Sequence, residues 1–206
     1  MGLRLLKVVL YSYLFLMALN GKLRGQFNNF YIKELISMFV LSQKSLEKLN
    51  GVHPNVVNFL KELILISPWD FKITAGVRTA AEQNLEYQKG RTLPGIKVTK
   101  ADGYKQKSNH QIKFDGLGYA ADIGVLVREK VKITMIENGK KVEKIVEKLV
   151  YKGDWRDFHY YQDIYNTAKN AGLLEKYSIE WGGNCWKSFK DAPHWQIKGA
   201  DKVAYK

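Results

Sequence analysis

The sequence contains only one cysteine, Cys185, among 206 residues. A single cysteine excludes an intrachain disulfide and any metal site built from cysteine alone. A metal ion bound by this chain must therefore be held by histidine and carboxylate side chains. The sequence also lacks internal repeats and low-complexity tracts, so no repeat architecture is indicated.

Acidic residues are scarce, with 20 Asp and Glu against 33 Lys and Arg, and the formal net charge is +13. This excess favours polyanionic partners, which include nucleic acid, anionic membranes and acidic cell-wall polymers, without choosing among them. The composition is otherwise ordinary, at 46% hydrophobic and 26% charged residues. It argues against a disordered, collagen-like or multi-span membrane protein and predicts one domain with at most an appendage.

The apolar stretch near the N-terminus is too short to span a bilayer. It covers residues 8–19 (VVLYSYLFLMAL), whereas a spanning helix needs about 20 residues. Arg4 and Lys7 precede it, as in a secretory signal, but no small-x-small cleavage site follows Ala18. Three interpretations of residues 1–37 stay open: an export or anchor segment that contacts a membrane through residues 8–19, which ranks first, a helix packed on the domain, or sequence upstream of a start at Met38.

Residues 38–206 predict one compact domain of mixed helices and strands. Helical periodicity covers residues 42–49, 56–66, 80–88 and 154–170, and Thr79 is suited to cap the third of these helices. Strand-like stretches lie at residues 71–75, 119–127, 179–181 and 194–197. Residues 91–118 are rich in Gly, Lys and Asp, and we expect them to form long loops of the kind that often carry function.

Residues 128–152 predict a β-hairpin. Two runs rich in β-branched residues, at 131–136 and 142–150, flank Asn138-Gly139, which is the strongest short-range signal for a hairpin turn. Eight basic residues and four glutamates give this segment a net charge of +4. A solvated two-stranded flap is the simpler interpretation, and a contact surface for an anionic polymer is the other.

The sequence has four histidines, which fall into two groups. His53 lies at a helix entry and His159 on a predicted helix, so we expect structural or solvent-exposed roles for both. His110 and His194 instead lie in loop sequence with a carboxylate nearby. These two histidines are therefore the candidates for chemistry.

Two carboxylates accompany these histidines. Asp122 opens the apolar strand that follows His110, and Asp191 precedes His194 by three residues, across a proline. An aspartate at the head of an apolar strand is costly to bury unless it is paired or binds a metal. Two imidazoles and one carboxylate form a common zinc-ligand set, and a second carboxylate can serve as general base. The spacing alone does not separate a metal site from a chance pairing of His and Asp.

Three sequence blocks resemble the motifs of the VanY-like zinc metallopeptidases. They read FKITAGVRTAAEQ (71–83), SNHQ followed by GYAADIG (108–124) and IEWGGNCWKSFKDAPHWQ (179–196), and the opening LSQKSLEKLNGVHPNVV (41–57) is similar as well. Within this group the chain is most similar to the L-alanyl-D-glutamate peptidoglycan endopeptidases of phage endolysins and bacterial wall hydrolases. The resemblance covers residues 38–198 in order, which is far more specific than any single motif.

The resemblance implies an α+β fold of the DD-peptidase/Hedgehog type, with a small, mainly antiparallel sheet, packed helices and a zinc cleft. It implies Zn²⁺ as cofactor and the peptidoglycan stem peptide as substrate. It also implies action in the cell wall or periplasm, after export, membrane anchoring or release by phage lysis. We expect a monomer, and we expect the charge of +13 to favour anionic wall polymers.

Carried over residue by residue, the resemblance also implies roles within the site. His110, Asp122 and His194 would be the zinc ligands, and Asp191 would be the base that deprotonates the attacking water. Arg78 would bind the substrate carbonyl and stabilise the oxyanion. Three further residues would contact substrate or line the cleft, and the last of them is equally suited to core packing: Ser108, Gln83 and Trp181.

The sequence departs from the family pattern in two places. Seven residues, 111–117, separate His110 from Gly118, where the family usually has two. Asp115 in this insertion is an alternative ligand, but Asp122 is favoured because it keeps the family's distance from Gly118 and lies on a strand. The hairpin at 128–152 stands where the family more often has a short connection.

Other functions remain open beside the endopeptidase. A D-alanyl-D-alanine carboxypeptidase would use the same motifs, and a non-catalytic wall-binding module would need Asp191 or the water position to be unusable. The positive charge suggests a nucleic-acid-binding protein, but the basic residues are spread along the chain and no helix-turn-helix, zinc-finger or ribonucleoprotein motif appears. We therefore expect no specific nucleic-acid partner.

Overall fold

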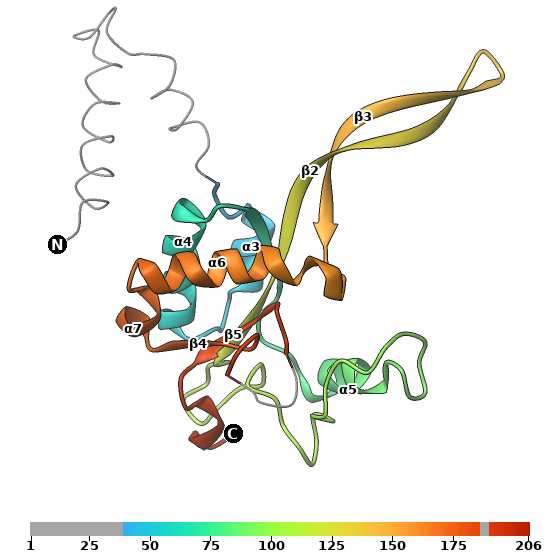
Figure 1. The fold of residues 1–206 in the computed structure, drawn as a ribbon. Helices are drawn as coiled ribbons and strands as arrows, with labels where there is room; N and C mark the ends of the chain where they lie inside the picture. Colours follow the sequence, from blue (N-terminus) through green and yellow to red (C-terminus); the bar gives the residue numbers. More distant parts are fainter. Residues whose placement is uncertain (1–38, 186–189) are drawn as a thin grey trace, which may run out of the picture. The chain divides into compact units, whose positions relative to one another are not determined.

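The computed structural model describes residues 39–185 and 190–206 (Figure 1). The predicted segment at residues 1–37 lies outside the described residues. Within them, no helix is both long enough and apolar enough to cross a membrane.

The described chain forms one unit of helices and strands. The α-helices are α3 (Gln43–Lys48), α4 (Pro54–Ile66), α5 (Ala80–Gln88), α6 (Phe158–Asn170) and α7 (Leu173–Tyr177). The strands are β1 (Asp70–Ala75), β2 (Ala120–Glu137), β3 (Lys140–Lys152), β4 (Ile179–Trp181) and β5 (His194–Ile197). Two short 3₁₀ helices complete the list, η1 (Trp155–Asp157) and η2 (Ala200–Lys202).

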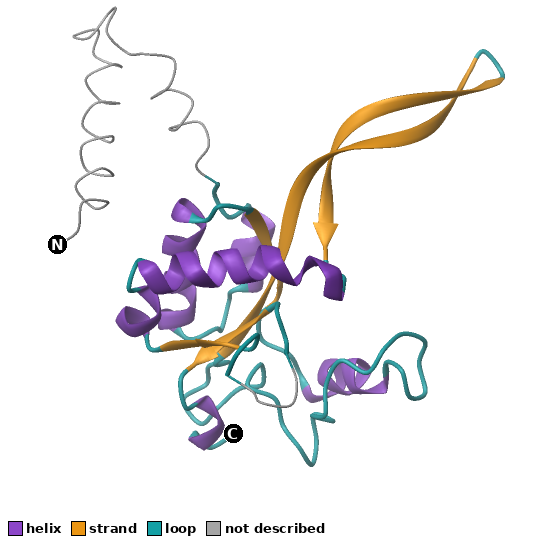
Figure 2. Cartoon of the chain, in the orientation of Figure 1, coloured by secondary structure: helices purple, strands orange, loops and turns teal. Residues whose placement is uncertain are grey.

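The strands form one antiparallel sheet in the order β1-β2-β5-β4, and β3 pairs with the distal part of β2. Helices α4, α6 and α7 gather on one side of this sheet, whereas α5 and the long loops lie on the other (Figure 2). The predicted α+β fold with a mainly antiparallel sheet is confirmed. Helix α7 was not expected from the sequence, because its five residues are too few to show a helical period.

The hydrophobic core fills the space between the sheet and the helices. Phe59 of α4 and Ile164 of α6 are fully buried, as are Ile123 and Val125 of β2. Because side chains alternate along a strand, Ile123 and Val125 point into this core while Asp122 and Gly124 point to the opposite face. The opposite face of β2 is therefore available for polar side chains that could form a functional site.

Local signals in the sequence position the elements around the site. Thr79 caps α5 as predicted, and it forms a reciprocal capping box with Glu82. The predicted hairpin is confirmed as well: Asn138 and Gly139 have φ angles of 50° and 75°, which is the backbone of a type I′ turn. The capping box fixes where α5 starts, at Ala80, two residues after Arg78.

Gly76, which follows β1, lies against another segment of backbone. A Cβ atom at this position would lie 1.9 Å from the carbonyl oxygen of Lys48. A backbone oxygen cannot rotate away as a side chain can, so only glycine fits here without displacement of the chain.

We therefore predict that Gly76→Ala lowers the free energy of unfolding by about 3 kcal/mol. Urea unfolding followed by circular dichroism measures this change. The control is Gly116→Ala, where the new Cβ meets no atom within 4 Å and only the left-handed backbone (φ 83°) opposes the substitution. That strain costs about 1 kcal/mol. Equal losses in the two variants would contradict the close approach at Gly76.

Candidate active site

His110, Asp122 and His194 converge on one point of the sheet. Their ligand-type atoms all lie within 4.8 Å of one another. Asp122 Oδ1 lies 3.2 Å from His110 Nε2 and 3.1 Å from His194 Nδ1, and the two imidazole nitrogens are 3.2 Å apart. Residues 84 positions apart in the sequence are thus brought into direct contact.

The sheet register brings two of these residues together. Asp122 of β2 and His194 of β5 are directly paired across antiparallel strands, so their side chains point to the same face. The backbone carbonyl of Asp122 also accepts a hydrogen bond from Thr74 Oγ1 at 3.1 Å, where the register of β1 shifts between Ile73 and Ala75. The third member, His110, comes from the loop before β2.

Hydrogen bonds orient the His110 ring. Its Nδ1 lies 2.7 Å from the carbonyl oxygen of Gly76, which can only accept, so Nδ1 carries the proton and Nε2 presents its lone pair to the cluster. The backbone of His110 is held on both sides. Its N–H donates to Ser108 Oγ at 3.3 Å, and its carbonyl accepts from the N–H of Arg78 at 3.0 Å.

The His194 ring is oriented by a chain of amides. Gln196 Nε2 donates to the Glu180 carboxylate at 2.6 Å, so Gln196 Oε1 faces His194 and accepts from its Nε2 at 2.8 Å. The same Oε1 accepts from Asn109 Nδ2 at 2.9 Å. His194 is thereby held with its Nδ1 lone pair toward Asp122.

The inserted loop supports this amide chain. Lys113 is fully buried, and its ammonium donates to Asn109 Oδ1 at 2.8 Å and lies 3.4 Å from the centre of the Tyr205 ring. Burial lowers the pKa of Lys113 to about 8, against the opposing effect of Asp201. The insertion at 111–117 is thus tied to the residues behind the site.

Arg78 joins the cluster from the other side of Asp122. Its Nη2 lies 2.5 Å from Asp122 Oδ2, the carboxylate oxygen that does not face the imidazoles. Gln83, which is 1% exposed, accepts from Arg78 Nη1 at 3.3 Å and donates to the carbonyl of Ala101 at 3.2 Å. Gln83 therefore positions the guanidinium and fastens it to the loop after α5.

The charges of the cluster shift its pKa values. Burial by itself raises the pKa of Asp122, but the two imidazoles and Arg78 outweigh it and hold that pKa well below 3.8. Burial lowers the pKa of His110, and the positive charge of Arg78 acts in the same direction, against the opposing effect of Asp122. For His194 burial acts in the same direction, but hydrogen bonding and attraction to Asp122 dominate and raise its pKa above 6.5.

Asp191 faces the same cleft from a tightly held turn. Its N–H donates to the carbonyl of Gly182 at 3.0 Å, and its carbonyl accepts from the N–H of His194 at 3.2 Å. Trp181 Nε1 donates to the carbonyl of Ala192 in this turn at 2.7 Å. Burial, together with the charge of Asp122, raises the pKa of Asp191 to about 6. A carboxylate with that pKa is well suited to exchange protons near neutral pH.

The cleft around the cluster has a volume of about 1900 Å³. Of the residues expected to act at the site, seven line it: Arg78, Gln83, Ser108, His110, Asp122, Asp191 and His194. Its lining includes basic residues, among them Lys48 and Arg91, and acidic residues, among them Glu47 and Glu82.

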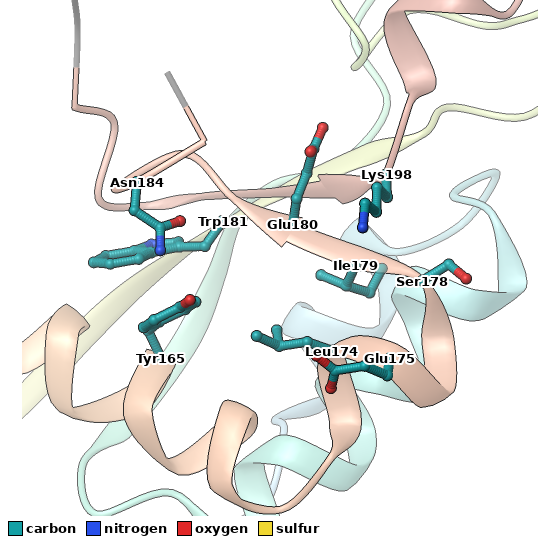
Figure 3. Close-up of a pocket in the computed structure, with 9 residues that line it drawn as sticks. All are labelled: Tyr165, Leu174, Glu175, Ser178, Ile179, Glu180, Trp181, Asn184 and Lys198. Carbon is teal, nitrogen blue, oxygen red and sulfur yellow. The ribbon is translucent and has the colours of Figure 1, made fainter. Parts of the chain in front are cut away.

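Trp181 does not line this cleft, although the sequence suggested a substrate contact. Its side chain is fully buried and stacks against Tyr165, with ring centroids 4.9 Å apart (Figure 3). On its other side lies Trp195, at 5.9 Å. The burial of Trp181 and its absence from the lining of the cleft favour core packing, which was one of the two expectations for this residue, over substrate contact. The hollow drawn in Figure 3, of about 360 Å³, lies beside this packing and holds none of the three clustered residues.

Asp115 lies apart from the cluster. It is exposed, and its two carboxylate oxygens accept from the Tyr119 hydroxyl at 2.9 Å and from the N–H of Leu117 at 3.1 Å. Among the described residues, His110, Asp122 and His194 form the only group with the geometry of a metal site. The structure thus favours Asp122 over Asp115 as the carboxylate ligand of a metal ion.

The ligand-type atoms of these three residues are suited to bind a metal ion. Two imidazole lone pairs and one carboxylate oxygen face one another, while the outer nitrogens of both rings and Asp122 Oδ2 are bonded elsewhere. Such outer contacts are typical of metal-binding histidines, because they fix the tautomer and the ring orientation. The described residues therefore contain a possible His-Asp-His metal site.

The sequence did not identify the residues that hold the ligand-type side chains. Gln196 follows His194 by two residues on a strand, so strand alternation was a usable signal that both face the same side. Asn109 precedes His110 directly within the SNHQ block, but no role was expected for it. The carbonyl of Gly76 has no sequence signal, because any residue provides a carbonyl.

Comparisons with known proteins point to one family of peptidases. A family model described as phage L-alanyl-D-glutamate peptidase matches residues 37–152. The peptidoglycan L-alanyl-D-glutamate endopeptidase CwlK of Bacillus subtilis is 29% identical over 162 residues, which cover 76% of this chain and 81% of CwlK. The crystal structure of the Serratia marcescens L-Ala D-Glu endopeptidase ChiX matches with a TM-score of 0.50 and 23% identity, over 81% of this chain and 96% of ChiX. At that identity the match to ChiX supports the fold alone.

We predict that Gln196→Leu weakens metal binding by about 10- to 100-fold, because His194 loses the acceptor that fixes its ring. Isothermal titration with Zn²⁺ measures the affinity, and thermal unfolding of the metal-free protein checks that the fold persists. Gln162→Leu, on the outer face of α6, is the control and should bind metal normally. Unchanged affinity in a folded Gln196→Leu protein would contradict the role of this contact.

We also predict that metal affinity falls as the pH decreases through the raised pKa of His194. A metal ligand must be neutral imidazole, so protons compete with the metal below this pKa, and the affinity drops by about tenfold per pH unit. Titrations between pH 8 and pH 5 in buffers of different ionisation enthalpy measure both the affinity and the protons released. His159→Gln should leave the profile unchanged, because His159 lies on α6 outside the cluster. A flat profile would disprove competition by protons.

Proposed function

Because the chain belongs to the phage L-alanyl-D-glutamate peptidase family, whose model matches more than half of it, we propose that it is a zinc-dependent peptidoglycan endopeptidase that uses His110, Asp122 and His194 as metal ligands. The bond that it cuts is the L-alanyl-D-glutamate amide of the stem peptide. The observation that carries the proposal is the convergence of one nitrogen from each imidazole and one oxygen of Asp122. The outer nitrogen of each ring and the second oxygen of Asp122 are bonded to other groups.

Zn²⁺ bound at this cluster would act as a Lewis acid that makes water more acidic and polarises the scissile carbonyl. Asp191 acts as general base: it accepts the proton of the attacking water and later passes it to the leaving amine. Its pKa of about 6 supports this role, because the carboxylate is ionised at neutral pH yet remains basic enough to take up a proton.

Arg78 supplies positive charge where negative charge develops on the carbonyl oxygen. The guanidinium already contacts Asp122 Oδ2, so it is fixed in place before substrate arrives. Gln83 holds the other arm of the guanidinium, and Ser108 supports the backbone of His110. Fixed donors of this kind typically contribute about 10²- to 10³-fold to the rate of related reactions.

The cleft also suits the substrate. A glutamate residue within a peptide keeps one free carboxylate, whichever of its two carboxyl groups joins the next residue. Basic residues in the lining of the cleft, such as Lys48 and Arg91, can complement that charge. We place the site of action in the cell wall, where peptidoglycan is found.

Mass spectrometry of fragments released from purified peptidoglycan tests the proposal. The zinc-loaded protein should create new amine ends on D-glutamate, and a chelated sample should create none. Release of terminal D-alanine alone would instead assign a carboxypeptidase. No release by folded, zinc-bound protein would indicate a wall-binding module.

We predict that Asp191→Ala retains zinc but loses at least about 10³-fold in hydrolysis, because only the proton acceptor is removed. His194→Ala should lose both zinc and hydrolysis, because a ligand is removed. Metal analysis after gel filtration, together with rates on a short peptide containing the L-Ala-D-Glu amide, separates the two effects. Equal zinc loss in the two variants would refute the assignment of roles.

A further inference from the structure

The hairpin of β2 and β3 extends away from the rest of the described domain (Figure 1). The two strands pair without a register shift from Val125 and Lys152 to Glu137 and Lys140. Beyond Leu126, β3 is the only described strand that pairs with β2. Both faces of this ribbon are thus available to a partner, and the proposed catalytic roles leave it unused.

One face of the hairpin continues the face of β2 that carries Asp122. Because side chains alternate along the strand, Asp122 is followed on the same side by Arg128, Lys130 and Lys132. Lys141 of β3 is paired with Ile136 and therefore joins this face. We call these four residues the basic face of the hairpin. The core side of β2, with Ile123 and Val125, continues instead along the opposite face.

The basic face keeps a net positive charge, because its four basic residues outnumber the two glutamates on the same face, Glu143 and Glu147. Lys132 forms an ion pair with Glu143 at 2.5 Å. Arg128, Lys130 and Lys141 are exposed and form no ion pair with any described residue. Glu147 is nevertheless paired across the strands with Lys130, and Arg128 is close enough to Asp70 to act on the pKa of that carboxyl. Three cationic groups are thus spaced along one side of an extended ribbon, where they can bind several negative charges of one polymer.

The wall of the catalytic cleft leads directly to the basic face. Tyr151 is paired with Leu126, lies on the same side of the ribbon and lines the cleft. Gly153 and Trp155 line the cleft next to it, and Trp155 is 83% exposed. A polymer that occupies the cleft can therefore continue past Tyr151 and along the hairpin.

We propose that the basic face binds the peptidoglycan polymer beyond the stem peptide held in the cleft. This inference rests on the proposed function, which makes peptidoglycan the substrate. Since glutamate keeps a free carboxylate, every uncut stem peptide adds negative charge to the polymer. Several weak contacts with one polymer reinforce one another, so the hairpin raises the local concentration of substrate at the active site.

Distance separates this surface from the catalytic site. Arg128 follows Asp122 by six residues, or about 20 Å at about 3.3 Å per strand residue, and the other members of the basic face lie farther out. A peptide of five residues spans at most about 18 Å when fully extended. A short peptide in the cleft therefore cannot reach the basic face, whereas the polymer can.

The test compares two double variants of the full chain. Lys130→Gln with Lys141→Gln removes two charges from the basic face. Lys140→Gln with Lys148→Gln removes two equally unpaired charges from the opposite face of the same hairpin. Co-sedimentation with purified peptidoglycan, freed of covalently attached phosphate polymers, measures binding, with Asp191→Ala in every protein to prevent digestion.

We expect the basic-face variant to bind peptidoglycan about three- to tenfold more weakly at low ionic strength and the opposite-face variant to bind like the parent. The difference should vanish near 0.5 M salt, because exposed charges are screened there. With Asp191 restored, all three proteins should cleave a short L-Ala-D-Glu peptide with equal kcat/KM. Only the basic-face variant should digest the polymer more slowly.

Three outcomes would overturn the inference. If the basic-face variant binds peptidoglycan like the parent, the basic face is not a binding surface. Equal losses of binding in both variants would show general charge attraction without a preferred face. If the basic-face variant lost binding to phosphatidylglycerol vesicles but not to peptidoglycan, the partner would be a membrane. Failure of the parent to cleave the short peptide would refute the proposed function instead, while the co-sedimentation result would still stand.

Discussion

The carboxylate of Asp122 contacts two imidazoles through one oxygen and a guanidinium through the other, and the remainder of the site is arranged around these contacts. Removing a carboxylate from water costs several kcal/mol unless opposite charge and hydrogen bonds replace the lost hydration. Arg78 supplies positive charge at Asp122 Oδ2, whereas the imidazoles of His110 and His194 turn lone pairs toward Oδ1 in the tautomers set by Gly76 and Gln196. A cation placed between the three donor atoms would satisfy the same carboxylate, which is why these residues suit a metal ion.

The outer contacts decide whether the donors remain aligned. A carbonyl fixes the proton on His110 Nδ1, and Gln196 fixes the proton on His194 Nε2. Behind Gln196, the Glu180 carboxylate and Asn109 leave its amide only one orientation. The turn that carries Asp191 is fastened to the sheet through Gly182 and through the indole of Trp181. The geometry of the cluster is thus maintained by hydrogen-bonded groups behind it rather than by the cleft surface.

Strand β2 connects the core, the cleft and the hairpin because its side chains alternate along 18 residues. Its first residues direct apolar side chains into the core and Asp122 into the cleft. The same alternation, continued past Leu126, places Arg128 and Lys130 on the side of the ribbon that Asp122 occupies. One uninterrupted strand can therefore relate a surface about 20 Å away to the reacting site without any further element.

The sequence by itself determined the elements that depend on local interactions. The Thr79 cap, the Asn138-Gly139 turn and the amphipathic pattern of α4 are set by neighbouring residues, so they could be predicted. The motif blocks also pointed to His110, Asp122, His194, Arg78 and Asp191 as members of one site. Only the tertiary structure decided which groups hold them. The pairing of Asp122 with His194, the contact of Gln83 with Arg78, and the burial of Trp181 and Lys113 all join residues distant in sequence, whose approach depends on the register of the sheet and the packing of the core.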